Sequence, residues 1–354
     1  MRLLAAMSGG VDSSVAAALA RQAGHDVTGV TLKQWEFPDE ETRLVKGCCT
    51  LDAVADARRA ADVIGIAHYT LDFRDSFAAE VVGPFVADYA NGLTPNPCVR
   101  CNERVRFGAL WERAQMLGFD GLITGHYARV QDGRLLRARN RAKDQSYVLY
   151  AVGRAVLERV LFPIGEIESK DDVRELAHRL GLPNAGRDDS VEVCFVGEGR
   201  KPGDVIAERV PAAVRSGPIV DRNGEVVGEH RGLPFYTIGQ RRGLGSFGSQ
   251  ASYVTALLPH ANTLVVGDRP ALQARGLEAV RPRFVAGIAP ADGAALTAVV
   301  RYHGAETEAT FTPTGDGFRL EFARPVESVA PGQAVVLYDG DEVVGGGTIA
   351  RALA

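Results

Sequence analysis

The feature that most restricts the fold of this 354-residue chain is the heptad SGGVDSS, which follows an apolar run near the first residue. The run RLLAAM is typical of a buried strand, and DSSVAAALARQAG is typical of a helix that ends at Gly24. Backbone N–H groups at such a helix N-terminus bind anions, and glycines let the anion approach closely. The heptad therefore predicts a phosphate-binding loop, although it lacks the lysine of a Walker-type loop. A serine-capped glycine turn that binds nothing is the alternative.

Strands and helices alternate through the first half of the chain. The strand-like DVTGVTL and AHYTLDF frame the helical CTLDAVADARRAADVIG, and RFGALWERAQMLG precedes the strand-like FDGLITG. This order predicts an α/β domain with a parallel sheet, in which ligands collect beyond the carboxyl ends of the strands. After about Gly197, glycine-rich turns separate short alternating runs, which is typical of all-β structure. We predict a catalytic domain at 1–200, a small central domain at 201–275 and a β-barrel at 276–354.

Composition and charge exclude several classes of protein. The net charge of −4 argues against a generally basic nucleic-acid coat, so any nucleic acid must meet local basic patches. Asp12 and the paired glycines interrupt the first apolar stretch, which argues against a secretory signal. The uncharged stretch 254–267 is too short to span a bilayer. We expect a cytoplasmic protein with no membrane partner.

Five cysteines, an odd number in a large chain, indicate thiol or metal chemistry rather than a disulfide scaffold. Cys98 and Cys101 form a C-x-x-C pair in TPNPCVRCN, and Cys194 stands in DSVEVCFVG. Sulfur chemistry, an iron–sulfur cluster, half of a zinc site and inert thiols all remain open for them. Cys48 and Cys49 favour a structural role, with auxiliary sulfur or metal ligation as the alternative.

The stretch from Arg129 to Lys143 concentrates positive charge. It holds six basic residues and a single acid, Asp132. Such a stretch predicts contact with a phosphate backbone, and a solvated hairpin is the alternative. Arg241 and Arg242, between glycines in GQRRGLG, form a second candidate contact.

Eight stretches, in order along nearly the whole chain, carry a resemblance to a known family. They are SGGVDSS, TPNPCVRCN, TGHYAR, KDQSYVLY, LFPIGE, DSVEVCFVG, TIGQRRGLG and PGQAVVLYDGDEVVGGGTI. Together they resemble the bacterial tRNA-specific 2-thiouridylases, or tRNA-uridine 2-sulfurtransferases, of the PP-loop ATP pyrophosphatase superfamily. The resemblance implies an adenine nucleotide alpha-hydrolase-like fold, and use of ATP with Mg²⁺, cleaved between the α and β phosphates. It also implies that sulfur replaces the 2-oxygen of the wobble uridine in the tRNA anticodon loop.

The resemblance also implies roles for individual residues. Those expected to hold ATP are Ala6, Met7, Ser8, Gly9, Gly10, Val11, Asp12, Ser13, Leu32 and Gly125. Those expected to meet the target base or the rest of the tRNA are Asn96, Pro97, Cys98, His126, Lys143, Asp144, Gln145, Arg301, Tyr302 and Gln333. Cys194 would receive sulfur as a persulfide from a relay that begins at a cysteine desulfurase. Cys101 would be the partner nucleophile.

The chemistry of the pyrimidine agrees with these roles. The 2-oxygen leaves badly until AMP is attached to it, after which a persulfide sulfur can attack C2. Cys101 can then cleave the remaining S–S bond by thiol–disulfide exchange, which leaves a Cys101–Cys194 disulfide.

Cys98 departs from the family pattern, in which aspartate is common at this position. Three thiolates, Cys98, Cys101 and Cys194, suit a [4Fe–4S] cluster with one open iron, which could carry sulfide in place of the persulfide. Two further functions stay open. One is another PP-loop adenylating enzyme, such as an amide ligase or a thiolase of another RNA position. The other is an ATP- and tRNA-binding module without catalysis.

Overall fold

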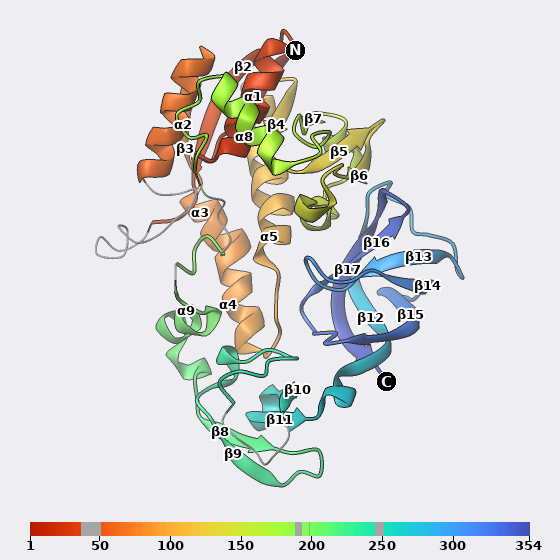
Figure 1. Cartoon of the computed structure of the whole chain (residues 1–354). Coiled ribbons are helices and arrows are strands. Elements are labelled where there is room, and N and C mark those ends of the chain that lie inside the picture. The colour runs from red at the N-terminus through yellow and green to blue at the C-terminus, as the bar shows by residue number, and fades with distance from the viewer. Residues whose placement is uncertain (37–50, 188–192, 198, 245–250) are drawn as a thin grey trace.

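The computed structural model describes residues 1–36, 51–187, 193–197, 199–244 and 251–354. Figure 1 shows three bodies: an amino-terminal sheet flanked by helices, a small sheet below it, and a barrel that carries the carboxyl terminus. The predicted fold class is thereby confirmed. Cys48 and Cys49 lie outside the described residues, so nothing follows here for the prediction that concerns them.

The amino-terminal sheet is parallel and has the strand order β3-β2-β1-β4-β7. Its strands are β1 (Arg2–Ala6), β2 (Asp26–Lys33), β3 (His68–Asp72), β4 (Gly121–Thr124) and β7 (Val160–Leu161). The central strand β1 is apolar throughout its middle because helices cover both faces of the sheet. The chain winds outward from β1 in both directions, so the switch point lies between β1 and β4. Ligands bind at such a point, beyond the carboxyl ends of the strands.

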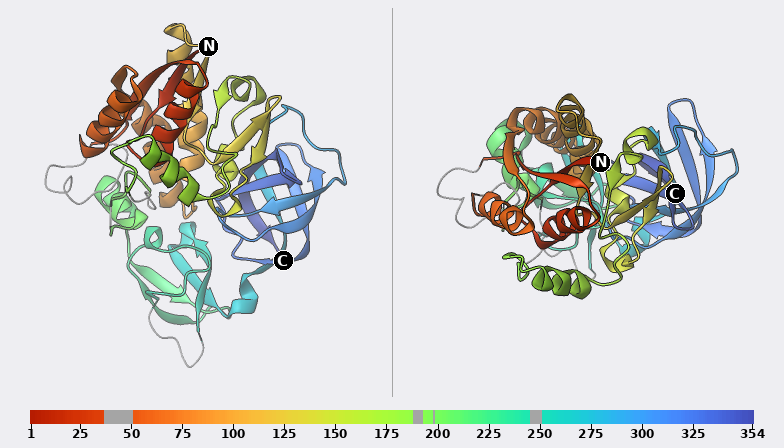
Figure 2. Two further views of the ribbon diagram at one scale, coloured as in Figure 1. Left: turned by 45° about the horizontal axis from the view of Figure 1, so that its top comes forward. Right: turned by 90° about the horizontal axis from the view of Figure 1, so that it is seen from above.

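Helices cover this sheet on both sides, as the right-hand view of Figure 2 shows. The α-helices described in this part of the chain are α1 (Val11–Gln22), α2 (Leu51–Ile64), α3 (Arg74–Phe77), α4 (Gly83–Ala90), α5 (Pro97–Arg100), α6 (Leu110–Met116), α7 (Arg154–Leu157) and α8 (Lys170–Arg179). Two π-helical stretches, η1 (Ala78–Val82) and η2 (Cys101–Ala109), continue α3 and α5. Ser169 caps α8, because its hydroxyl accepts from the Asp172 amide at 3.0 Å. Within the described ranges, no helix has the length and apolar character needed to cross a bilayer.

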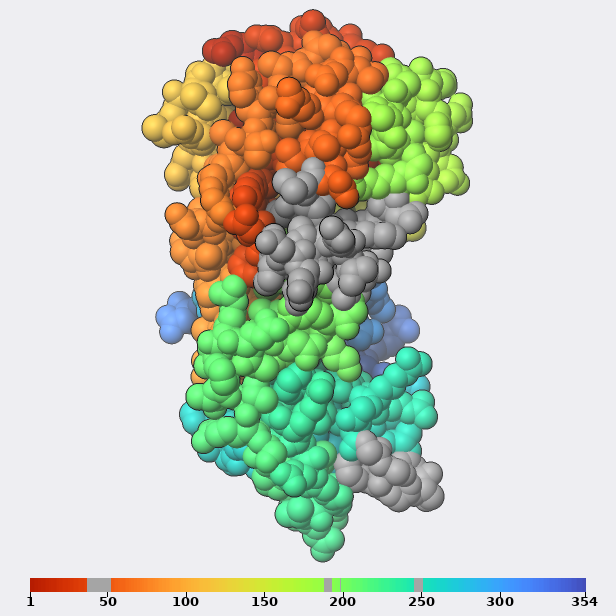
Figure 3. Space-filling model, turned by 90° about the vertical axis from the view of Figure 1, so that its left-hand side faces the viewer, coloured from red at the N-terminus to blue at the C-terminus, as the bar shows by residue number. Residues whose placement is uncertain are grey.

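The central body contains helix α9 (Pro202–Arg209) and a four-stranded sheet. The strands are β8 (Gly217–Val220), β9 (Val226–His230), β10 (Tyr253–Leu258) and β11 (Thr263–Gly267), in the order β10-β11-β8-β9. Apart from the α- and π-helices, the described residues contain short 3₁₀ helices: η3 (Arg141–Lys143), η4 (Ser146–Leu149), η5 (Pro211–Ala213), η6 (Leu233–Phe235), η7 (Pro259–Ala261) and η8 (Arg269–Leu272). Helix α9 packs against α4, which joins the central body to the first; Figure 3 shows this face.

The carboxyl-terminal body is a closed barrel. Its strands are β12 (Gln273–Phe284), β13 (Ala295–Val299), β14 (Thr307–Pro313), β15 (Gly317–Glu327), β16 (Ala334–Asp339) and β17 (Glu342–Leu353). They run β12-β15-β14-β13-β16-β17, and pairing of β12 with β17 closes the ring. Side chains such as Phe311, Phe318 and Leu320 are buried inside it, so the barrel has a packed core.

The hairpin of β5 (Ala128–Gln131) and β6 (Arg134–Arg137) extends the barrel sheet through a pairing of β6 with β17. Its arginines pair mainly with acids of the barrel: Arg129 and Arg141 with Asp341, Arg134 with Glu342, and Arg137 with Glu306. These ion pairs link the hairpin and the segment that follows it to the barrel, and several of the arginines are still about half exposed. Their predicted contact with a phosphate backbone stays a prediction.

Candidate functional site

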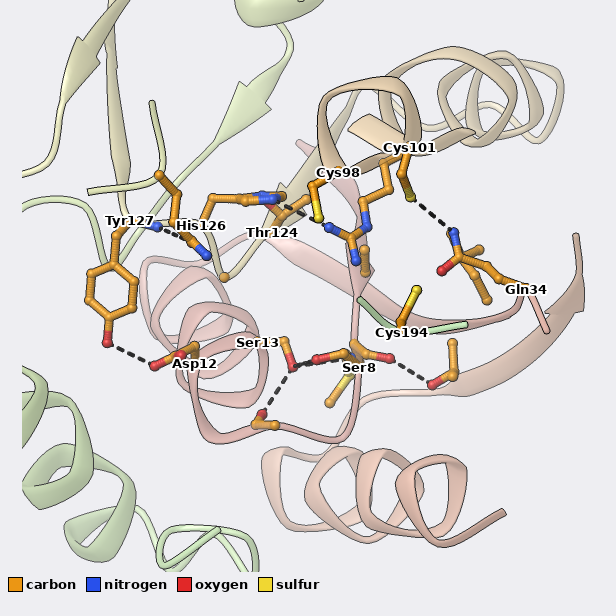
Figure 4. A pocket seen from close by; sticks show the side chains of 18 of the residues that line it. Ser8, Asp12, Ser13, Gln34, Cys98, Cys101, Thr124, His126, Tyr127 and Cys194 are labelled. Carbon is orange, nitrogen blue, oxygen red and sulfur yellow. Dashed lines mark hydrogen bonds between the residues drawn. The ribbon is translucent and has the colours of Figure 1, made fainter. Parts of the chain in front are cut away.

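A cavity of about 540 Å³ lies beyond the carboxyl ends of β1, β2 and β4. Its walls come from the SGGVDSS loop, the start of the α5–η2 helix, the segment that carries Cys194, and Tyr302 of the barrel. Figure 4 shows side chains of the loop, of the start of the α5–η2 helix and of the Cys194 segment around the same space. The volume is in the range of small-molecule sites, and the place is the switch point of the sheet.

Two glycines give the loop its shape. Gly9 has φ +79°, and a Cβ there would lie 2.3 Å from the carbonyl oxygen of Ala53 in α2. Gly125, just after β4, would place a Cβ 2.5 Å from the amide nitrogen of Ser13. Only residues without a side chain therefore allow α2 and β4 to close around the first turn of α1.

Hydrogen bonds inside the loop hold its amides in place. Ser13 Oγ donates to the Gly10 carbonyl at 3.0 Å and accepts from the Ser8 amide at 3.1 Å. The Asn184 Nδ2 group, buried at 4% exposure, donates to the Gly9 carbonyl at 2.8 Å and to Ser14 Oγ at 2.9 Å. Asn184 is thus a brace of the loop from a distant part of the sequence.

Asp12 faces charged and polar partners. Lys170, the first residue of α8, donates to both of its carboxylate oxygens at 2.7 and 2.8 Å. The Tyr127 hydroxyl donates to Oδ1 at 2.8 Å. This carboxylate therefore fixes α8 and the end of β4 against the loop.

Three cysteines line the cavity: Cys98, Cys101 and Cys194, the three that the family resemblance assigns to one site. Cys98 is exposed, Cys101 is 7% exposed and Cys194 is half-buried. Asn96 caps α5 by accepting from the Cys98 amide at 3.0 Å, so the helix begins with its first thiol at the cavity wall. Gln34 at the end of β2 donates from Nε2 to the Cys101 sulfur at 3.5 Å.

The neighbour of Cys194 anchors it. Phe195 is 2% exposed and packs edge-on against Phe85, with ring centroids 4.9 Å apart. It also packs against Phe77 at 5.7 Å and Trp35 at 6.0 Å. Because Phe195 is fixed in this aromatic cluster, the Cys194 side chain is directed toward the cavity from the wall opposite α5 (Figure 4).

The thiols were also predicted to suit an iron–sulfur cluster. Among the described residues, no group of three His, Cys, Asp or Glu side chains is close enough to hold one metal ion. A cluster instead spreads its cysteine ligands over several irons. The cluster on Cys98, Cys101 and Cys194 therefore stays a prediction, and what the structure shows is that the three thiols line one cavity.

His126 is buried beside Arg106 and Thr124. Its Nε2 lies 3.4 Å from Arg106 Nη1 and its Nδ1 lies 2.7 Å from Thr124 Oγ1. Because arginine is only a donor, Nε2 is the acceptor and the proton resides on Nδ1. Burial, and secondarily the Arg106 charge, lowers the pKa of His126 to about 3. His126 is therefore a neutral acceptor at the cavity wall.

This burial predicts a pH dependence of stability. The folded-state pKa lies below the usual 6.5, so the stability contributed by neutral His126 is present above pH 6.5 and lost as pH falls toward 3. Between pH 7 and pH 5 the unfolding free energy of the wild type should fall further than that of the His126→Asn variant. The difference should be about 1–2 kcal/mol. Urea unfolding at both pH values measures this. An equal loss in both proteins would contradict the assignment; the variant retains His68, whose lowered pKa contributes equally to both.

The barrel side of the cavity is polar and aromatic. Gln145 accepts from the Tyr127 amide at 3.0 Å, which ties the KDQ stretch to the end of β4. Burial, followed by the nearby charge of Cys98, raises the pKa of Tyr302 to about 12, so the phenol is neutral near pH 7. Tyr302 therefore places a neutral phenol of the barrel in the same cavity as Cys98.

Most of the predicted site residues meet at this cavity, and the others support it. Those that line it are Ala6, Met7, Ser8, Gly10, Val11, Asp12, Ser13, Leu32, Pro97, Cys98, Cys101, Gly125, His126, Lys143, Gln145, Cys194 and Tyr302. Gly9, Asn96, Asp144, Arg301 and Gln333 are outside the lining. Asp144 is partly buried and accepts from the Ala138 amide at 2.8 Å, and Gln333 donates to the Thr94 carbonyl at 2.9 Å. Both therefore hold chain segments that lead to the cavity.

Sequence reasoning missed Gln34, Arg106 and Arg187, which also line the cavity. Arg106 reaches it because η2 is π-helical, and a π turn brings residue i+5 back toward residue i, here Cys101. The expected α-helical spacing gave no such signal. Gln34 directly follows the strand DVTGVTLK, and its place at a strand end was the signal available.

The chain matches families in three successive parts. Residues 1–198 match the family described as tRNA methyl transferase HUP domain. Residues 203–268 match the tRNA methyl transferase PRC-barrel domain, and residues 274–349 match the Aminomethyltransferase beta-barrel domain.

Relatives that align with nearly the whole chain carry the name tRNA-specific 2-thiouridylase. The chain is 48% identical to the tRNA-specific 2-thiouridylase MnmA of Moorella thermoacetica, over 98% of each protein. It is 48% identical to the protein of that name from Streptomyces avermitilis, over 99% of this chain and 95% of the relative. The MnmA of Chloroflexus aurantiacus is 45% identical, over 99% of this chain and 98% of the relative.

Proposed function

The chain belongs to the family of tRNA-specific 2-thiouridylases, and from this premise we propose that it makes 2-thiouridine at the wobble position through an adenylated base and a cysteine persulfide. One observation carries the proposal. The phosphate-binding loop and the thiols of Cys101 and Cys194 line one cavity, although they come from three separate parts of the sequence. A nucleotide on the loop and a base beside the thiols would then share a single reaction space.

The first step activates the base. The loop amides and Ser8 hold the pyrophosphate part of ATP, so that uridine O2 attacks the α-phosphorus and pyrophosphate leaves. The N3 proton is lost, and the ring then carries AMP on O2. Magnesium enters with the phosphates of ATP, since Asp12 is already held by Lys170 and Tyr127.

The next two steps exchange oxygen for sulfur. The outer sulfur of a Cys194 persulfide attacks C2, the C–O bond breaks, and AMP leaves with the electron pair, which forms a C2–S–S–Cys194 adduct. The Cys101 thiolate then attacks the Cys194 sulfur. The S–S bond to the uridine breaks, the electron pair stays on the uridine sulfur, and N3 is reprotonated.

Partners must close the cycle. Each turnover leaves a Cys101–Cys194 disulfide, so a thiol reductant supplies two electrons, as the reducing cytoplasm allows. A cysteine desulfurase or a relay protein supplies the persulfide sulfur. The tRNA presents the wobble base flipped out of the anticodon stack.

The experiment that tests the proposal is mass spectrometry of wobble uridines after incubation of tRNA with this protein, MgATP and a persulfide donor. We expect 2-thiouridine and one pyrophosphate released per modified base. Unmodified uridine in aerobic and anaerobic incubations alike would overturn the proposal. Bound ATP that stays intact when tRNA is added would instead favour the non-catalytic module.

A further inference from the structure

The SGGVDSS loop supplies amides and hydroxyls to an anion but no cationic side chain. Among the described residues, the arginines and lysines that line the cavity are Arg106, Lys143 and Arg187. Arg106 lies against His126, and Lys143 belongs to the stretch tied to Tyr127 on the barrel side. Lys170 reaches the loop from α8, but it donates to both carboxylate oxygens of Asp12 and does not line the cavity. Among the lining cations, this leaves Arg187 on the loop's side of the cavity.

A turn that is braced against the loop carries Arg187. Three residues earlier, Asn184 donates to the Gly9 carbonyl and to Ser14 Oγ, so this turn lies directly on the first turn of α1. The Arg187 Nη1 group forms an ion pair with Asp56 of α2. The carbonyl of Ala53, one helical turn before Asp56, touches Gly9. The guanidinium is therefore held on the part of α2 that also contacts the loop, and it lines the same cavity as the loop.

The ion pair with Asp56 is suited to exchange. Both side chains are partly accessible, at 26% and 21%, so neither charge is sealed in the interior. Asp56 is shared with Arg59, which lies three residues further along α2. When Arg187 turns to another anion, Asp56 keeps a cationic partner. A pyrophosphate group carries more charge than one carboxylate and accepts the planar guanidinium fork bidentately.

We propose that Arg187 binds the β- and γ-phosphates of ATP, replacing Asp56 as its partner, and so supplies the cation that the loop lacks. The inference rests on the proposed function in placing ATP on this loop. It adds that recognition of the pyrophosphate part depends on a side chain from the turn before Cys194. After transfer of AMP, the same arginine holds the departing pyrophosphate.

Calorimetric titration of the full chain with ATP, pyrophosphate and AMP tests this. We expect R187Q to bind ATP and pyrophosphate about 10- to 100-fold more weakly, while its affinity for AMP changes by less than about threefold. R187K, which keeps the charge and loses the fork, should lie between the wild type and R187Q. R179Q is the matched control, since Arg179 is an exposed arginine of α8 that pairs with Glu175 outside the cavity lining; its ATP affinity should match that of the wild type.

The outcomes separate this inference from the proposed function. An R187Q protein that binds ATP as the wild type does would overturn the inference and leave thiolation untouched. Equal losses for ATP and AMP would also overturn it, because they would mean that Arg187 supports the fold of the pocket. A wild-type protein that binds no ATP would overturn both. If thermal unfolding shows that R187Q does not fold, the R187K protein provides the test. An R187K affinity for ATP and pyrophosphate equal to that of the wild type would refute bidentate binding by the Arg187 guanidinium.

Discussion

Replacing Cys194 by serine is expected to abolish 2-thiouridine formation, with a loss of at least about 1,000-fold. The serine hydroxyl cannot carry a persulfide, so no sulfur reaches C2. The first step needs only the loop and ATP, so release of pyrophosphate stimulated by tRNA should persist. The two measurements are mass spectrometry of the wobble base and a pyrophosphate assay on the same sample. Formation of 2-thiouridine by the C194S variant would refute the persulfide route.

Replacing Cys101 by serine should give a different defect. Sulfur is transferred to the base, but the S–S bond to Cys194 is not cleaved, so a covalent protein–tRNA adduct should accumulate without added thiol. Dithiothreitol should release 2-thiouridine from it, because an external thiol can perform the same exchange. A non-reducing gel followed by nucleoside analysis measures this. If the C101S variant forms no adduct and keeps full thiolation activity, Cys101 takes no part in the sulfur transfer.

The Cys98→Asp variant distinguishes the persulfide route from the cluster route, and the measurements are thiolation activity and iron content. In the persulfide route Cys98 forms and breaks no bond, and its charge acts on Tyr302. The C98D variant should therefore keep its thiolation activity within about tenfold of the wild type. A cluster held by three thiolates would lose a ligand and its iron together. Loss of both iron and activity in an anaerobic C98D preparation would favour the cluster.

Replacing Gly9 by alanine is expected to have the largest effect among changes in the ATP loop. The new Cβ would meet the Ala53 carbonyl oxygen at 2.3 Å, and the residue would have to keep φ +79°. We expect the unfolding free energy to fall by about 2–4 kcal/mol and ATP binding to weaken at least about 100-fold, because α2 and the loop must separate. Urea unfolding and nucleotide titration measure the two effects.

Gly24→Ala is the matched control for this prediction. Gly24 ends α1 with φ +85°, yet nothing lies within 4 Å of its Cβ position. It should therefore show only the backbone cost of about 1–2 kcal/mol, with ATP affinity unchanged. If G9A were no worse than G24A, close contact between the loop and α2 would be unimportant.

Much of the molecule could be predicted from local pattern. The alternation of strands and helices predicted the sheet domain, and the glycine-rich alternating runs predicted the later β bodies, because each pattern follows from which face of an element is buried. The cysteines and the heptad were recognised from residue chemistry. The π-helical stretch at Cys101 was not predicted, because an extra residue in a turn leaves no clear mark on helical periodicity.

The sequence by itself determined which chemical groups this protein has: a glycine- and serine-rich loop, the thiols of Cys98, Cys101 and Cys194, and a run of arginines. Only the tertiary structure decided which of these groups lie together. The arginines of the β5–β6 hairpin pair with Asp341 and Glu342, about 200 positions away, while Arg187, which pairs with Asp56, lines the cavity. The reason is physical: the energy of a charge depends on its neighbours in space, and folding chooses those neighbours over long sequence separations.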